Sequence, residues 1–280
     1  MNSGRKRLRR VGALARQRLL GAPLLALLCV TLVAPWGSAR SAETGDSCVD
    51  CHSDANFLVT NKKLYDYFQK WRVSIHGQEE VSCVDCHGGN SEAAEKDAAH
   101  GGDLDSSNFK SAVNFRNIPD TCGVCHDEIY AGFQESKHFE HVLAKEQEDQ
   151  GPTCVTCHGS INVAILNVNT VEETCSRCHN EESENAPETP EDARALLNRF
   201  LSIHRYYRYI TVRGEPNETK SFFEAIDEQI RALSVTWHTF DLDAIEEKTE
   251  AVLGSVRKKR EEVAKAYKQQ RRKRESPPSP

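Results

Sequence analysis

Apolar residues follow three different patterns along the chain. Leu19 to Val33 form one continuous apolar stretch. Residues 42–180 have few periodic apolar positions and several turn signals, such as Gly151-Pro152. From Glu191 onward, apolar residues recur at the spacing of a helix. The patterns therefore predict an N-terminal apolar segment, a loop-rich middle and a helical C-terminal part.

The periodic stretches give the bounds of individual helices. Short helices are expected over Asn61–Arg72 and Glu128–Glu146, and longer ones over Glu191–Val212, Ser221–His238 and Ala244–Lys273. The last two carry apolar rows that suit an antiparallel pair: Phe222, Ile226, Ile230 and Leu233 on one, and Ile245, Val252, Val256 and Val263 on the other. The expected fold class is mainly α, with much irregular loop.

The N-terminal segment has the features of an export signal. Seven basic residues precede an apolar stretch that is short for a membrane span, and small residues follow at Ala39 and Ser41. We expect residues 1–41 to be a cleaved signal peptide and the rest of the chain to be periplasmic. An uncleaved anchor, which would associate the protein with the membrane, is the alternative.

Charge is unevenly distributed. Residues 1–40 hold eight of the 36 Lys and Arg and no Asp or Glu, so the remaining chain carries 28 basic against 42 acidic residues, a net charge near −14. An acidic surface disfavours nucleic acid and favours partners with a basic docking patch. The end of the chain is the exception, because Arg257 to Arg274 holds ten basic residues.

Ten of the eleven cysteines fall into one pattern, C-x-x-C-H. The paired cysteines are Cys48 and Cys51, Cys83 and Cys86, Cys122 and Cys125, Cys154 and Cys157, and Cys175 and Cys178, followed by His52, His87, His126, His158 and His179. This pattern attaches c-type haem. Two thiols bind the two vinyl groups as thioethers, and the adjacent histidine lies under the ring as an axial ligand of iron.

Two other interpretations of the cysteines explain less. A zinc site or a redox dithiol uses C-x-x-C, and an exported chain can use cysteines for disulfides. Neither requires a histidine after the second cysteine in all five motifs. We therefore expect five covalent haem c groups. Their apolar faces would also replace the side-chain core that residues 42–180 lack.

Six further histidines are available as second, distal ligands of iron: His76, His100, His138, His141, His204 and His238. Five haems with two histidines each need five of them. The one methionine is Met1, so methionine ligation is not expected in the mature protein. His141 follows His138 by three residues on one helical face, so it is more often a neighbour than a ligand.

The motif spacing and the helical pattern suggest three segments. These are the signal at 1–41, a haem domain at 42–180 and a helical region with a basic tail at 181–280, with an acidic linker at 181–190. Consecutive motifs begin 35, 39, 32 and 21 residues apart, too close for separate haem domains. The haems are therefore expected to share one body.

Two stretches resemble the repeats of the multihaem cytochrome c superfamily. They are Ser74-Ile75-His76-Gly77 before the second motif and Ser136-Lys137-His138 before the fourth. The superfamily includes tetrahaem quinol-oxidising cytochromes, pentahaem donors to nitrite reductase and hydroxylamine oxidoreductase-like enzymes. The resemblance implies that His76 and His138 each cap another haem. Every motif here ends in His, whereas ammonia-forming nitrite reductases end the catalytic motif in Lys.

The functional expectation is electron transfer between redox protein partners through closely spaced bis-histidine haems, with a membrane quinol-oxidising complex as one candidate partner. One alternative is an oxidoreductase in which one open haem acts on nitrite, hydroxylamine or a similar small species. In that case His141, Tyr206, Tyr207 and Arg208 would be candidates for acid–base work. Another is an electron-transfer subunit of a larger multihaem complex.

Overall fold

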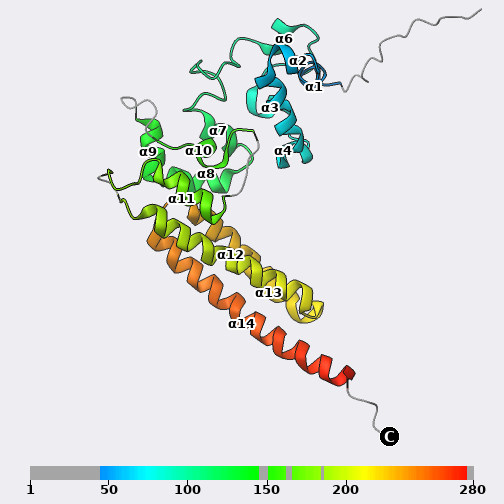
Figure 1. Ribbon diagram of the computed structural model, residues 1–280, viewed down its shortest axis with the longest axis vertical. Coiled ribbons are helices and arrows are strands. Elements are labelled where there is room, and N and C mark those ends of the chain that lie inside the picture. The colour runs from blue at the N-terminus through cyan, green and yellow to red at the C-terminus, as the bar shows by residue number, and fades with distance from the viewer. Residues whose placement is uncertain (1–44, 145–150, 162–165, 184–185, 276–280) are drawn as a thin grey trace, which may run out of the picture. The chain divides into compact units, whose positions relative to one another are not determined.

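The computed structural model describes residues 45–144, 151–161, 166–183 and 186–275. The proposed signal and Cys29 lie outside these residues. The described part is mainly helical and contains no strand, which confirms the expected fold class (Figure 1). None of its helices combines the length and the apolar character needed to cross a bilayer.

The middle of the chain forms short helices joined by turns. Their bounds are α1 Ser47–His52, α2 Phe57–Thr60, α3 Lys62–Val73, α4 Ile75–Gln78, α5 Cys83–His87, α6 Lys96–His100, α7 Ile118–Gly123, α8 Asp127–Gln134, α9 Lys137–Leu143, α10 Cys154–His158 and α11 Val168–Ser176. Helix α3 matches the helix expected at 61–72. The single helix expected at 128–146 is wrong, because it divides into α8 and α9 at Ser136.

A buried serine causes that division. The Ser136 hydroxyl donates to the carbonyl of Phe133 at 2.6 Å and accepts the backbone N–H of Phe139 at 3.1 Å. It thereby ends one helix and caps the next. Ser74 does the same between α3 and α4, donating to Trp71 and accepting from Gly77. Both serines are 1% exposed.

Three long helices follow, α12 Thr189–Arg213, α13 Pro216–Trp237 and α14 Leu242–Glu275. They run in alternating directions (Figure 1), and α14 packs on both α12 and α13. The expected pair of the last two helices, α13 and α14, is present. The prediction did not include α12, which has the more extensive contact with α14. Helix α12 also takes in Thr189 and Pro190, which had been expected in the linker.

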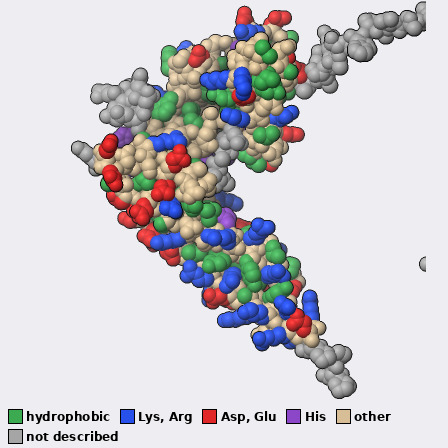
Figure 2. All heavy atoms as spheres, viewed as in Figure 1, with side chains coloured by type: hydrophobic (Ala, Val, Ile, Leu, Met, Phe, Trp, Pro, Cys, Tyr) green, Lys and Arg blue, Asp and Glu red, His purple; other side chains and the backbone are tan. Residues whose placement is uncertain are grey.

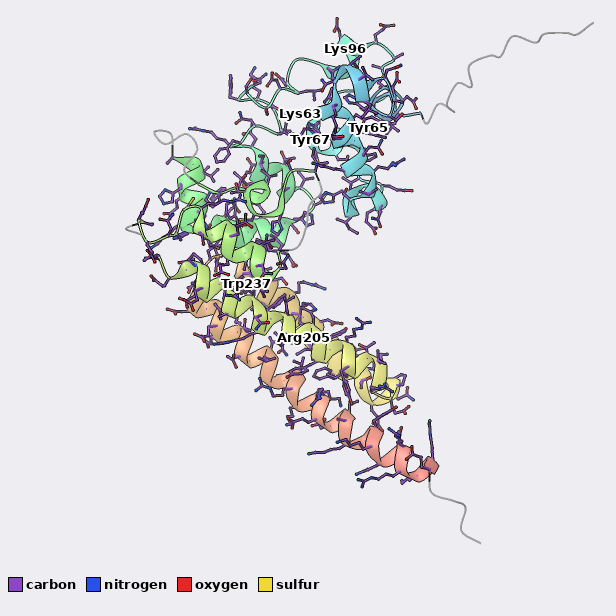
Figure 3. The ribbon with its side chains drawn as sticks, in the orientation of Figure 1. Lys63, Tyr65, Tyr67, Lys96, Arg205 and Trp237 are labelled. Atoms are coloured by element: carbon purple, nitrogen blue, oxygen red, sulfur yellow. The ribbon has the colours of Figure 1, made fainter. Side chains whose placement is uncertain are left out.

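Side chains of the three long helices form a closed core. The buried residues are Ile203, Ile210, Ile226, Leu233, Val252, Leu253, Val256 and Val263. A second, smaller cluster of Val171, Ala193 and Leu197 joins α11 to α12, and Trp237 packs against it (Figure 3). The helical region is thus anchored to the part of the chain that carries the cysteine motifs.

Candidate haem-attachment site

Each cysteine motif forms one helical turn. Helices α1, α5 and α10 contain the first, second and fourth motifs in full. In the third and fifth motifs the helix ends inside the motif, but the backbone N–H of the histidine still donates to the carbonyl of the first cysteine, at 3.0 Å for His126 and 2.9 Å for His179. Residues three and four apart share a helical face, so both thiols and the imidazole can reach one ring.

Polar caps begin the turns of the first, second and fourth motifs just before the first cysteine. The Asp46 carboxylate accepts the N–H of Cys48 at 2.8 Å. The N–H of Ser82 donates to Asp85, and the N–H of Thr153 donates to the Thr156 hydroxyl. Because a cap satisfies the free N–H groups of a first turn, these residues explain why such short segments are helical.

The ten cysteines of the motifs are free thiols in the described chain. Burial is the main cause that raises the pKa of Cys83 and of Cys157 to about 11 each. No disulfide joins any of these ten thiols, so all remain available for thioether bonds.

Consecutive motifs are neighbours in space. The N–H of Ser47, beside the first motif, donates to the carbonyl of Ser91, just after the second, at 2.8 Å. Burial and then the neighbouring Cys122 raise the pKa of Cys86, so the second motif adjoins the third. Helix α10, which is the fourth motif, contacts both α7 and α11, which carry cysteines of the third and fifth.

Thiols of the third and fourth motifs touch directly. A hydrogen bond to Cys154, together with burial, raises the pKa of Cys122. Between the fourth and fifth motifs, burial and then Cys175 raise the pKa of Cys157. The five motifs therefore lie next to one another in space in the same order as in the sequence.

Four motif histidines each face a second histidine across a similar gap. The ring centroids of His52 and His100 are 6.2 Å apart, those of His126 and His76 6.2 Å, those of His179 and His138 6.0 Å, and those of His158 and His238 6.1 Å. A metal–imidazole bond measures about 2 Å, and a ring centroid lies about 1 Å from its nitrogen, so two imidazoles on one metal have centroids about 6 Å apart. The spacing fits an iron held between each pair.

Backbone carbonyls orient two of the histidines that lie opposite motif histidines. The Nδ1–H of His100 donates to the Lys96 carbonyl, and that of His238 donates to the Ser234 carbonyl, both at 2.8 Å. A bond at Nδ1 leaves Nε2 free as the ligand, which is the usual arrangement for histidines that bind metals.

Burial favours the neutral, ligating form of several imidazoles. It lowers the pKa of His87, and it is the largest cause that lowers the pKa of His52 and His238. For His138, burial and then His179 lower the pKa to about 4. A neutral imidazole offers the nitrogen lone pair that a metal needs.

The aromatic ring of Phe240 links two of these pairs. Its centroid lies 4.4 Å from that of His138 and 6.5 Å from that of His238. Its backbone has φ of 57°, which is rare for a bulky residue. Sequence reasoning missed Phe240, because its role depends on a tight turn between α13 and α14.

The remaining candidates do not face a motif histidine in the described structure. His141 is exposed beside His138, and His204 packs on Phe200 at 4.9 Å in α12. Tyr206 and Tyr207 pack on the core of the long helices, and Arg208 is exposed on α12.

One comparison with known proteins bears on this site. Residues 107–185 match the family model of cytochrome c7 and related cytochrome c, and this segment holds the third, fourth and fifth motifs. No solved structure matches the chain. The match supports a multihaem c-type cytochrome, with covalently bound haem c and a role in electron transport.

Proposed function

We propose that this protein is a periplasmic pentahaem c-type cytochrome that transfers electrons between redox protein partners. The single observation that carries the proposal is the set of four histidine pairs at 6.0–6.2 Å, each joining a motif histidine to one from elsewhere in the chain. Haem c supplies one-electron redox chemistry at iron.

The protein's own residues hold and connect the attachment points. His76 precedes the second motif but faces His126 of the third, and His138 precedes the fourth but faces His179 of the fifth. Each pairing thus reaches past one motif and ties distant segments together. Consecutive motifs are also neighbours in space. Both observations favour redox groups that lie close together over groups that are isolated from one another.

Charge and export suggest the partners. The chain after residue 40 is acidic, so a soluble partner would present a basic patch and dock quickly and weakly. In contrast to this acidic average, Lys and Arg gather toward the C-terminal end of α14 (Figure 2). We propose a membrane quinol-oxidising complex as donor, with assembly into a larger multihaem complex as the second arrangement.

The ligand assignment is tested with neighbouring histidines. His138→Met should raise the potential of one haem and leave five attached, because thioether ligation favours reduced iron more than imidazole does. His141→Met is the matched control, since His141 lies three residues away and faces no motif histidine. Spectroelectrochemical titration measures the haem potentials, and intact mass gives the number of attached haems. Equal behaviour of the two variants would contradict the assignment of His138.

Electron transfer is tested by stopped flow. The fully reduced protein is mixed with mitochondrial cytochrome c, a basic acceptor, at several salt concentrations. We expect all haems to be oxidised together, with a rate that falls as salt rises because screening weakens steering. Oxidation of only part of the haem in that phase, with the rest far slower, would argue against a connected set.

A further inference from the structure

His87, in the second motif, differs from the other four motif histidines. All eleven histidines lie within the described residues, and four of the five motif histidines face a distal imidazole at 6.0–6.2 Å. His87 has no ring contact of this kind in the described structure. Of the six further histidines, four are already opposite other motifs.

The two histidines left over are not positioned for His87. His204 lies on α12, packed against Phe200. His141 is an electrostatic neighbour of His138, which faces the fifth motif. His100 does border the same space as His87, but its ring faces His52 and its Nδ1–H is held by the Lys96 carbonyl.

A cavity of about 300 Å³ lies beside His87, bordered also by Leu104, by Lys110 and by Asp103, whose carboxylate accepts a hydrogen bond from Asn108. Glycines keep it open. A Cβ at Gly88, Gly101 or Gly102 would meet no atom within 4 Å, so these positions leave free space on the wall. Gly88 and Gly101 also have positive φ, which disfavours other residues there.

The loop that carries Lys110 is held by side-chain amides. Asn108 donates to Asp103 at 2.8 Å, and its side-chain oxygen accepts the N–H of Lys110 at 3.0 Å. Asn117 donates to the carbonyls of Phe109 and Ser111, both at 2.8 Å. These bonds hold the backbone at Lys110, whose exposed side chain borders the cavity and carries its ammonium 5.9 Å from the centroid of the Phe109 ring.

We propose that the iron held by His87 has no second histidine ligand and binds a small exogenous anion, with Lys110 supplying the positive charge beside it. The inference rests on the proposed attachment of a haem at Cys83 and Cys86. The proposed site would let one iron of an electron-transfer protein bind an exogenous ligand.

The first test is ligand stoichiometry. Intact mass and a pyridine haemochrome assay establish that five haems are attached. Carbon monoxide is then titrated into the reduced protein. We expect one carbon monoxide per chain. His100→Ala should raise this to two, because it opens the iron on His52 as well.

The second test concerns Lys110. Lys110→Leu, which removes the charge without adding a possible iron ligand, should weaken cyanide binding to the oxidised protein about five- to tenfold, since loss of a nearby charge removes about 1 kcal/mol of attraction. Carbon monoxide binding should not change, because that ligand is neutral. Lys63→Leu, on the exposed face of α3 (Figure 3), is the matched control and should alter neither.

Several outcomes would overturn the inference. Five attached haems with no carbon monoxide binding would mean that every iron is closed. Carbon monoxide binding that appears only in Lys110→Leu would make Lys110 itself the ligand. If His100→Ala still binds only one carbon monoxide per chain, the open iron is not the one held by His87. Fewer than five haems by mass would instead contradict the proposed pentahaem cytochrome.

Discussion

The long helices α12 to α14 and the motif segment at 45–183 are built in different ways. The long helices share a core of eight buried apolar side chains, among them Ile203, Ile210 and Val256, which are fully buried. The motif segment is longer, yet its buried large apolar residues are few and scattered: Phe68, Phe133, Val142 and Val171. One region is held by its own side chains, and the other by caps, turns and facing histidines.

The difference is explained by the cost of ordering a chain. Fixing one residue costs about 1–2 kcal/mol, and burying a large apolar side chain returns about 1.5–3 kcal/mol. The long helices offset this cost by regular burial. The motif segment has too few buried side chains, so the apolar faces of the attached groups must provide the missing burial. The expectation that residues 42–180 lack a side-chain core therefore agrees with the few buried apolar residues described in that segment.

The strongest way to break this comparison is to prevent haem attachment. Replacing all ten motif cysteines with Ala should unfold residues 45–183 while α12 to α14 stay helical, because only the former depends on the attached groups. Limited proteolysis with mass spectrometry measures this. Rapid cleavage is expected within the motif segment and slow cleavage within the long helices. Equal protection of both would show that the motif segment folds on its own side chains.

Within the long helices, Ile210→Ala should lower the free energy of unfolding by about 2–5 kcal/mol, because Ile210 is 0% exposed in the side-chain core. The haem potentials should not move. Val212→Ala, on the same helix at 66% exposure, is the control and should change stability little. Thermal denaturation followed by circular dichroism and by haem absorbance separates the two regions.

Gly132 joins the two regions. A Cβ there would meet the carbonyl oxygen of Val235 at 2.7 Å, so Gly132→Ala must push α8 away from α13. We expect a loss of about 1–3 kcal/mol and a shift in the potential of the haem on His158, whose partner His238 follows α13. Gly254→Ala, with nothing near its Cβ, should be neutral or slightly stabilising.

The smallest expected effect is at Phe240. Phe240→Leu removes ring contacts to His138 and His238 and should cost about 0.5–1.5 kcal/mol. Two haem transitions should shift, those of the irons on His158 and His179. Phe109→Leu, at an exposed phenylalanine, should shift neither. A change in one transition alone would mean that Phe240 does not link the two pairs.

Much of the local structure could be predicted from the sequence. The spacing of apolar residues anticipated the ends of α3 and of the three long helices to within five residues, because amphipathic periodicity is a local property. The break between α8 and α9 at Ser136 was not predicted. A serine inside a helical pattern is also compatible with an unbroken helix, so its presence alone does not mark the end of one, even though Ser74 separates α3 and α4 in the same way.

The prediction of haem attachment came from the sequence alone, since C-x-x-C-H brings two thiols and an imidazole together within one helical turn. The pairing of histidines was decided only by the tertiary structure. His76 and His138 reach past the nearest motif, and His238 comes from the end of α13 to face His158. Such pairings join residues that are distant in the chain, so no local pattern encodes them, and the tertiary packing of the helices sets which imidazoles meet.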